Sequence, residues 1–429
     1  MTRKDSQKTA SGGDRNQGFR RIWRWHSRAG IAIAPLLLVM VITGGIYLLE
    51  PQIEDLQYAD LLYLQQPYSG AVDHTALATQ IESSYPQSRI RHYQPARSPG
   101  ESAQFLVDRQ NGKTLTIFLH PGEGRVLGIV DESLRLTTVA KKIHGGLMAG
   151  VTGEVIVELV ACWTILMAVS GLYLWWPRSR RLRGTLIPRS GNAALRDLHA
   201  IPGALLGLWI LVIIATGLPW SVVWGGLLKQ GGEIAGEALP EAVFQSRPQS
   251  GEPRGRARLD LNGVMAIVGG LEFNHAYRID YPWGPRGSFT VFPLRRGGEA
   301  QDTAYFFIDQ YSGELLREIR WPDMGAVGRA TAIGVALHEG RLFGSANQML
   351  NLAALLVLVA LATTGCLMWW RRRSRAAGVR AVQGDVPTGL KWTLISLAVL
   401  LPLAGVTMLA IWLWDKWRQR GGEIGAAAT

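Results

Sequence analysis

The chain has 429 residues, of which 48% are hydrophobic and only 18% are charged. This composition is too apolar for a soluble globular protein and is typical of an integral membrane protein. Lysine and arginine exceed aspartate and glutamate by 45 to 33, but the excess lies in a few short segments, which does not indicate a nucleic-acid-binding surface. Cys162 and Cys366 lie in apolar runs without a Cys-x-x-Cys motif, which excludes disulfide scaffolds, zinc ribbons and covalently attached haem.

Five stretches are apolar over roughly the 20 residues that a helix needs to cross a bilayer. They cover residues 29–49, 151–176, 199–224, 346–370 and 391–414. The first has no small-x-small cleavage site after it, so we interpret it as an uncleaved membrane helix and not as a signal peptide. The sequence therefore predicts an α-helical integral membrane protein with five transmembrane helices.

Charge asymmetry predicts the orientation of these helices. Segments 1–28, 177–198 and 371–391 together carry 20 basic and 4 acidic residues, a net charge of +16. Segments 50–150 and 225–345 carry 22 basic and 25 acidic residues, a net charge of −3. By the positive-inside rule the N-terminus and the loops 177–198 and 371–390 are cytoplasmic, and the two long segments are external. A fifth span then places the tail, 415–429, outside.

Each external segment has the pattern of a small α+β module. The first has a helix-like stretch at 74–85 and alternating strands at 103–108 and 115–120, with Asn111-Gly112 as the hairpin turn between them. The second has a helix-like stretch at 261–271, strands at 277–281, 288–293 and 304–309, and a turn at Ser312-Gly313-Glu314. The sequence thus predicts two external α+β modules of similar construction.

Internal self-similarity shows that the chain is a duplication. A shift of 173 residues superposes His26, Gly30, Thr43 and Gly44 on His199, Gly203, Thr216 and Gly217. A shift of 194 residues superposes His144, Gly146, Gly150, Gly171, Trp175 and Trp176 on His338, Gly340, Gly344, Gly365, Trp369 and Trp370. The duplicated unit is helix, external module, helix, and the fifth span follows it.

The four histidines at matched positions lie near the ends of the predicted spans. His26 and His199 lie at the cytoplasmic entrance of their helices, and His144 and His338 precede the return helices on the outer side. Each membrane surface thus has two symmetry-related imidazoles, a geometry suited to one bis-imidazole haem iron per surface. The alternative is that they are interfacial residues, with the matched glycines serving helix packing. Zinc and copper fit less well because no carboxylate or thiolate occupies a repeat position.

Several strings of residues resemble the PepSY-associated transmembrane family. They are Trp23-Arg24-Trp25-His26 with Thr43-Gly44, His144-Gly145-Gly146-Leu147, Ser170 to Arg178, Arg196-Asp197-Leu198-His199, His338-Glu339-Gly340 and Thr364 to Arg371. The external modules resemble PepSY domains, most clearly at residues 307–314. The resemblance covers about residues 26–372 and implies a bacterial inner-membrane protein with periplasmic modules.

Members of this family include FoxB-type proteins, described as di-haem reductases of ferric siderophores. The resemblance therefore implies two b-type haems, with His26, His199, His144 and His338 as axial ligands, and reduction of a periplasmic ferric siderophore or other ferric chelate. The sequence has no Gly-x-Gly-x-x-Gly fingerprint or Walker loop, so the electrons are expected from a quinol or a cytoplasmic donor. Two alternatives are a non-enzymatic envelope protein whose PepSY modules bind a peptide or protease, and a membrane haem conduit for a partner reductase.

Further charged residues are candidates for supporting roles. Lys141, Lys142 and Arg329 flank the outer histidines, where the positive-inside bias does not explain their charge, and they are candidate partners of haem propionates. Glu158 lies within the second span and is a candidate proton relay, although its repeat counterpart is Leu352. The histidines at unmatched positions, which are His74, His92, His120 and His275, are interpreted as ordinary residues of the soluble modules.

Overall fold

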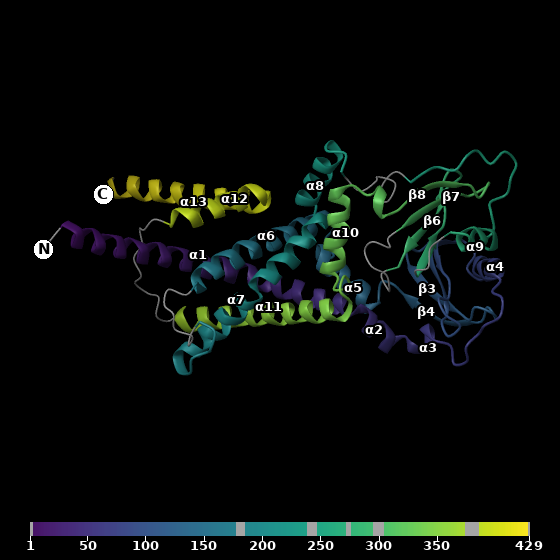
Figure 1. Ribbon diagram of the computed structural model, residues 1–429, viewed down its shortest axis with the longest axis horizontal. Coiled ribbons are helices and arrows are strands. Elements are labelled where there is room, and N and C mark those ends of the chain that lie inside the picture. The colour runs from purple at the N-terminus through teal and green to yellow at the C-terminus, as the bar shows by residue number, and fades with distance from the viewer. Residues whose placement is uncertain are drawn as a thin grey trace. The chain divides into compact units, whose positions relative to one another are not determined.

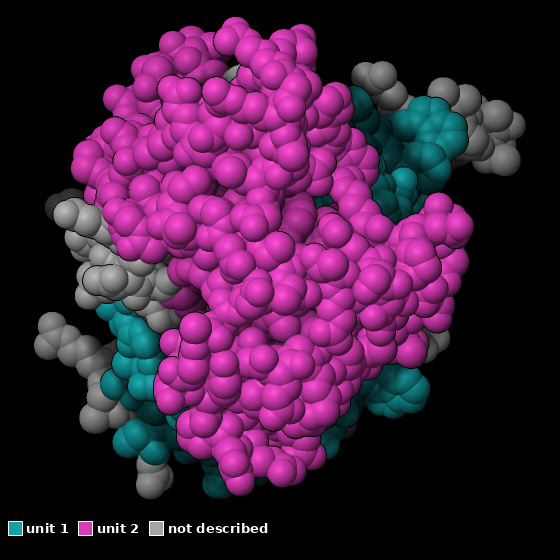
Figure 2. Space-filling view, turned by 90° about the vertical axis from the view of Figure 1, so that its right-hand side faces the viewer, with its two compact units in different colours: residues 1–45, 142–228, 337–429 teal, residues 46–141, 229–336 magenta. Residues whose placement is uncertain are grey.

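The computed structural model describes residues 3–176, 185–237, 247–271, 276–294, 304–373 and 386–427. Contacts divide the chain into two compact units, coloured separately in Figure 2. The membrane unit comprises residues 1–45, 142–228 and 337–429, and the sheet unit comprises residues 46–141 and 229–336. Each unit is therefore built from both halves of the duplication. Of the unmatched histidines, His275 lies outside the described residues.

The membrane unit contains the long apolar helices of Figure 1. Within the described residues, four helical stretches are long and apolar enough to cross a bilayer: Gln17–Leu48, Gly150–Trp175, Ala194–Trp220 and Gly344–Arg372. They belong to helices α1 (Arg3–Leu48), α6 (Gly150–Trp175), α7 (Ala194–Gly217) and α11 (Gly344–Arg373). These correspond to the first four predicted spans. A buried apolar cluster of Val41, Ile210, Ala354 and Leu358 joins α1, α7 and α11.

The fifth apolar run is divided between two helices. Helices α12 (Thr388–Leu400) and α13 (Pro402–Ala427) meet at a bend of 119°, and Figure 1 shows α13 folded back beside α12. The break occurs at Leu401, and Pro402, the first residue of α13, disfavours helical backbone at the residue before it. The Leu400 carbonyl at the break accepts a hydrogen bond from the indole of Trp224, 3.0 Å away. The fifth span predicted over 391–414 thus corresponds to a bent helix pair, and the described residues contain five candidate spans if this pair counts as one.

Helices α5 (Leu136–Gly146) and α10 (Ala326–His338) carry the outer histidines. They are separate from the membrane-crossing helices that follow them, because the chain turns sharply after each histidine. Leu147 and Met148 follow α5 with φ of 51° and 55°, and Gly340 follows α10 with φ of 74°. Left-handed backbone of this kind ends a helix. The turns therefore allow each histidine to occupy a helix of its own.

Helix α8 (Val223–Ile234) begins shortly after α7. Its first amides, those of Val223 and Trp224, donate to the Glu158 carboxylate at 2.8 and 2.9 Å. Glu158 is 1% exposed, and the unpaired amides at a helix N-terminus favour a carboxylate. Glu158 thus caps α8 within the membrane unit, and its role as a proton relay stays a hypothesis.

The sheet unit contains one antiparallel sheet of eight strands, in the order β4-β3-β2-β1-β5-β6-β7-β8. The first module supplies β1 (Ser88–Gln94), β2 (Ala103–Arg109), β3 (Thr114–Leu119) and β4 (Val126–Asp131). The second supplies β5 (Tyr277–Asp280), β6 (Ser288–Pro293), β7 (Tyr305–Asp309) and β8 (Leu315–Ile319). Strands β1 and β5 pair at His92 with Asp280 and at Tyr93 with Ile279. The two predicted modules therefore share a single sheet.

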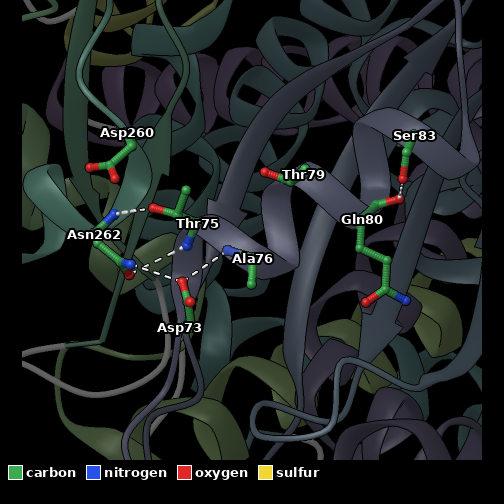
Figure 3. A pocket seen from close by; sticks show the side chains of 8 residues that line it. All are labelled: Asp73, Thr75, Ala76, Thr79, Gln80, Ser83, Asp260 and Asn262. Atoms are coloured by element: carbon green, nitrogen blue, oxygen red, sulfur yellow. Dashed lines mark hydrogen bonds between the residues drawn. The ribbon is translucent and has the colours of Figure 1, made fainter.

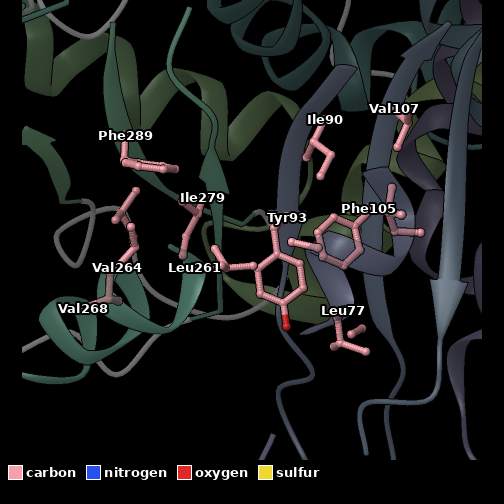
Figure 4. Packing of buried hydrophobic residues seen from close by; sticks show 14 of the residues in the cluster. Leu77, Ile90, Tyr93, Phe105, Val107, Leu261, Val264, Val268, Ile279 and Phe289 are labelled. Atoms are coloured by element: carbon pink, nitrogen blue, oxygen red, sulfur yellow. The ribbon is translucent and has the colours of Figure 1, made fainter. Parts of the chain in front are cut away.

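Helices α4 (His74–Ser84) and α9 (Leu261–Gly269) contribute to the core on one face of this sheet. Their N-terminal amides are capped by Asp73 and Asp260, which accept hydrogen bonds at 2.9 and 2.8 Å. Figure 4 shows the core that they cover, in which Tyr93 lies between residues of the two modules. The core is continuous across the junction, so the two modules stabilise each other.

The other face of the first module is covered by helix α3 (Ala59–Leu62), which follows helix α2 (Glu50–Gln57), through a cluster that includes Leu62, Phe118 and Val130. A buried ion-pair network connects α2 with the start of α5. Glu54 is 2% exposed and pairs with Arg135, which also bonds Glu132 at 2.8 Å. Thr137 donates to Glu54 at 2.5 Å. The network thus fixes the first turn of the helix that carries His144.

Candidate functional site

The structure brings the four repeat-matched histidines together as two pairs. The rings of His26 and His199 have centroids 6.3 Å apart and planes at 88°. The rings of His144 and His338 also have centroids 6.3 Å apart, with planes at 48°. We name these the inner pair and the outer pair. Each pair takes one histidine from each half of the duplication, as the sequence repeat predicts.

The two pairs lie at different depths of the membrane unit. His26 and Gly44 are 18 residues apart in α1, which corresponds to about 27 Å along a helix. His26 belongs to the inner pair, and Gly44 packs against the ring of His144 in the outer pair. This separation is comparable to the thickness of the hydrocarbon core of a bilayer, which is about 30 Å.

Each outer histidine bonds a backbone carbonyl through Nδ1. His144 Nδ1 lies 2.8 Å from the Met40 carbonyl oxygen, and His338 Nδ1 lies 2.8 Å from the Ile213 carbonyl oxygen. A carbonyl oxygen only accepts hydrogen bonds, so each Nδ1 carries the proton and donates it. In a neutral imidazole the lone pair then lies on Nε2, the form that binds a metal ion. Both outer histidines are therefore held in the same ligating tautomer.

Each inner histidine bonds a side-chain hydroxyl instead. His26 Nδ1 lies 2.9 Å from Ser170 Oγ, and His199 Nδ1 lies 3.0 Å from Thr364 Oγ1. The two hydroxyls donate their own protons to helix carbonyls, from Ser170 to Met167 at 3.1 Å and from Thr364 to Ala360 at 2.5 Å. Each hydroxyl oxygen is then an acceptor for the imidazole. The inner pair is thus held in the same tautomer as the outer pair.

Four glycines contact the histidine rings closely. A Cβ added at Gly44 meets His144 Cε1 at 2.8 Å, and one added at Gly217 meets His338 Cε1 at 2.9 Å. A Cβ added at Gly171 meets His26 Cε1 at 3.2 Å, and one added at Gly365 meets His199 Cε1 at 3.5 Å. These are the repeat-matched glycines of the sequence. At Gly44, Gly217 and Gly171 the absence of a side chain admits the imidazole of another helix.

A hydroxyl residue precedes each of these glycines, and sequence reasoning assigned it no role. The four dipeptides are Thr43-Gly44, Ser170-Gly171, Thr216-Gly217 and Thr364-Gly365. Thr216 donates to the Ile213 carbonyl at 2.8 Å, the carbonyl that holds His338. Thr43 donates to the Val39 carbonyl at 2.7 Å, and its hydroxyl lies 3.2 Å from the Met40 carbonyl that holds His144. A repeat search by identity alone misses the match of Ser170 with Thr364, whereas a search by hydroxyl chemistry finds it.

The arrangement fits a metal centre with two imidazole ligands. If the two Nε2 atoms faced each other across a metal ion, two metal–nitrogen bonds of about 2.0–2.1 Å and about 1.1 Å from each nitrogen to its ring centre would place the centroids about 6.3 Å apart. Both pairs have this separation. Among the described residues, no three His, Cys, Asp or Glu side chains form a metal-binding group, so each pair offers two protein ligands. Haem iron needs two.

The candidate propionate partners lie on α5 and α10. Lys141 and Lys142 are exposed, three and two residues before His144, and the Lys141 ammonium lies 5.4 Å from the centroid of the Tyr47 ring. Arg329 lies nine residues before His338, about 13 Å along the helix. Its repeat counterpart is Arg135 of the ion-pair network. On helix position alone, the lysines are closer to their histidine than Arg329 is.

The described histidines at unmatched positions have local partners. His74 Nδ1 lies 2.7 Å from the Tyr93 hydroxyl, and His120 Nδ1 accepts from the amides of Gly122 and Glu123. Burial lowers the pKa of His92 to about 4, an effect that the Arg278 charge reinforces. His92 is therefore neutral at pH 7.

The sheet unit also has an open hollow of about 620 Å³ beside the N-termini of α4 and α9, shown in Figure 3. Its polar groups bond one another: Asn262 accepts from the His74 amide at 2.9 Å and donates to Asp73 at 2.8 Å. The backbone N–H of Asn262 donates to the Thr75 hydroxyl at 2.9 Å. These bonds hold α4 against α9, so the hollow marks a junction of the two modules.

The family comparison covers most of the chain. The family model described as the PepSY-associated TM region matches residues 23–372. The chain belongs to this family. The matched region of this PepSY-associated membrane protein includes the four paired histidines and all four hydroxyl–glycine dipeptides. No curated protein matches the chain.

Proposed function

We propose that this protein is a di-haem b electron-transfer protein of the bacterial inner membrane that reduces a periplasmic ferric chelate, of the ferric-siderophore class, for iron acquisition. The observation that carries the proposal is the duplicated histidine pair, with a centroid separation of 6.3 Å in both copies. The Nδ1 bonds of all four histidines support it, because second-shell partners of this kind orient metal-bound imidazoles.

In the proposed sites His26 and His199 hold the inner haem, and His144 and His338 hold the outer one. Haem supplies a carrier that takes up and releases one electron at its iron. The protein contributes ring orientation through Ser170, Thr364 and the backbone carbonyls. Its apolar cluster at Val41, Ile210, Ala354 and Leu358 keeps water and ions out of the region that the helices share.

The positive-inside rule orients the pathway. The inner pair lies on the side of the basic segments 1–28 and 177–198, which the rule places in the cytoplasm. A quinol or a cytoplasmic donor would supply electrons there, one for each ferric ion reduced, with a quinol supplying two and releasing two protons. The outer pair, His144 and His338, would then deliver them to the periplasmic side.

The substrate class follows from coordination chemistry. Ferric iron in a siderophore is held by hard oxygen donors, and the added electron gives ferrous iron, which such donors hold more weakly because its charge is lower. Lys141 and Lys142 are exposed three and two residues before His144. Their charge would attract an anionic chelate toward the outer pair.

Stopped-flow spectroscopy of the dithionite-reduced protein tests this function. A ferric siderophore should reoxidise the haem bands faster than an anaerobic buffer control, and Lys141→Ala with Lys142→Ala should slow an anionic chelate more than a neutral one. Reoxidation by a cytoplasmic acceptor but by no ferric chelate would contradict the substrate class and favour a haem conduit for a partner reductase.

A further inference from the structure

The inner and outer pairs differ in what accepts the Nδ1 proton. Main-chain carbonyls of Met40 and Ile213 accept it in the outer pair, and no side-chain substitution removes a main-chain carbonyl. In the inner pair the acceptors are the side-chain hydroxyls of Ser170 and Thr364. One substitution can therefore remove an inner acceptor without altering the backbone.

The inner hydroxyls are built into their helices. Ser170 is fully buried and Thr364 is 5% exposed, and each donates its own proton to a carbonyl one turn earlier. A hydroxyl that donates in this way becomes a better acceptor, because hydrogen bonds in a chain polarise one another. An acceptor at Nδ1 raises the basicity of Nε2, the atom left to bind a metal ion. The hydroxyl thus affects both the tautomer and the ligand strength of the histidine.

We propose that Ser170 and Thr364 are positioning residues that set the metal affinity and the reduction potential of the inner pair independently of the outer pair. The proposal rests on the haem sites of the proposed function. A stronger donor at Nε2 stabilises ferric over ferrous iron, so loss of the hydroxyl should raise the potential of the inner haem. Loss of a second-shell partner typically weakens metal binding 10–100-fold.

Four variants of the full-length protein test the proposal. Ser170→Ala and Thr364→Val remove an acceptor, and Thr364→Val keeps nearly the same side-chain volume. Thr364→Ser keeps the hydroxyl and removes only the methyl group. The matched control is Thr363→Val, because Thr363 is the adjacent residue of α11, is exposed, and makes the same type of bond to a carbonyl one turn earlier. The readouts are haem content per chain and an optical redox titration.

We expect the titration of the unsubstituted protein to resolve two haem components. Ser170→Ala and Thr364→Val should raise one component, leave the other unchanged, and weaken haem retention 10–100-fold at that site. A tenfold selective loss of ferric affinity corresponds to about 59 mV. Thr364→Ser and Thr363→Val should behave like the unsubstituted protein.

Three results would overturn the proposal: no shift in either component, equal shifts in both, or the same shift with Thr363→Val. Absence of haem from the unsubstituted protein would instead overturn the proposed function, and this proposal with it. The two failures are therefore distinguishable from a single set of preparations.

Discussion

Alanine at the four paired glycines should affect the histidine pairs in a graded way. A Cβ at Gly44 or Gly217 would meet a histidine Cε1 at 2.8 or 2.9 Å, whereas one at Gly365 would meet His199 at 3.5 Å. Carbon atoms in good contact lie about 3.5–4.0 Å apart. Gly44→Ala and Gly217→Ala therefore require the outer rings to move by about 0.6–0.7 Å, while Gly365→Ala requires almost no movement.

Such a displacement is large for a metal ligand, since metal–ligand distances are fixed within about 0.2 Å. Gly44→Ala and Gly217→Ala should therefore lose the outer haem, Gly171→Ala should weaken the inner one, and Gly365→Ala should keep both. General unfolding is not expected, because alanine is favoured over glycine in a helix by about 0.5–1 kcal/mol. The effect should be confined to the pair that the glycine contacts.

Haem content and the absorption spectrum of each purified variant measure this, with thermal stability as a check on folding. Gly45→Ala is the matched control, since Gly45 is adjacent to Gly44 and its added Cβ would meet Leu355 at an ordinary 3.7 Å. If Gly44→Ala retained both haems unchanged, or if Gly45→Ala lost one as well, the packing of glycine against histidine would not explain the repeated motif.

Three further predictions concern the sheet unit and the C-terminal helices. His92 has a folded pKa of about 4, below its unfolded value of about 6.5, so the free energy of unfolding of the sheet unit should fall by about 3 kcal/mol as the pH drops from 6.5 to 4. Hydrogen exchange at the β1 amides measures this fall. If the His92→Gln variant lost stability over the same pH range by the same amount, the assignment to His92 would be contradicted. Glu54→Ala should destabilise the sheet unit by about 1.5–3 kcal/mol, because it removes one of the two carboxylates that pair with Arg135 and the acceptor of the Thr137 hydroxyl. Arg286→Ala, at an ion pair whose side chains are 65% exposed, should cost less than about 1 kcal/mol. Equal losses of stability in denaturant unfolding would refute this. Because α12 and α13 meet at 119°, single cysteines at Gly389 and Lys416 should be labelled from the same side of the membrane, and labelling from opposite sides would show that the pair crosses it.

Local patterns of sequence predict much of this fold. The four spans follow from apolar runs, and helix α4 and strand β6 appear at 74–84 and 288–293, close to where propensity and alternation place them. Strand β1 is not predicted, because its alternation is interrupted by a register shift between Ile90 and His92. The joining of the modules depends on pairing between β1 and β5, which are far apart in the sequence, and no local pattern encodes that.

The candidate site also has a part that the sequence predicts and a part that only the structure shows. The repeat identifies the four histidines and the four glycines, because these residues are identical in both halves. The acceptors of the outer pair are backbone carbonyls of Met40 and Ile213, which leave no trace in side-chain identity. The bend between α12 and α13 falls at Leu401, just before Pro402, inside a run that is apolar on both sides. Hydropathy alone detects the length of that run and not the change in helix direction within it.

Haem stoichiometry in histidine variants tests the central claim most directly. The protein purified from haem-replete cells should carry two b-type haems per chain, His199→Ala should lose the inner one, and His338→Ala should lose the outer one, each with the fold intact. A colourless preparation would remove the haem assignment and favour a non-enzymatic PepSY envelope protein that binds a peptide or protease. A single haem, or the loss of both from either folded variant, would contradict two independent histidine pairs.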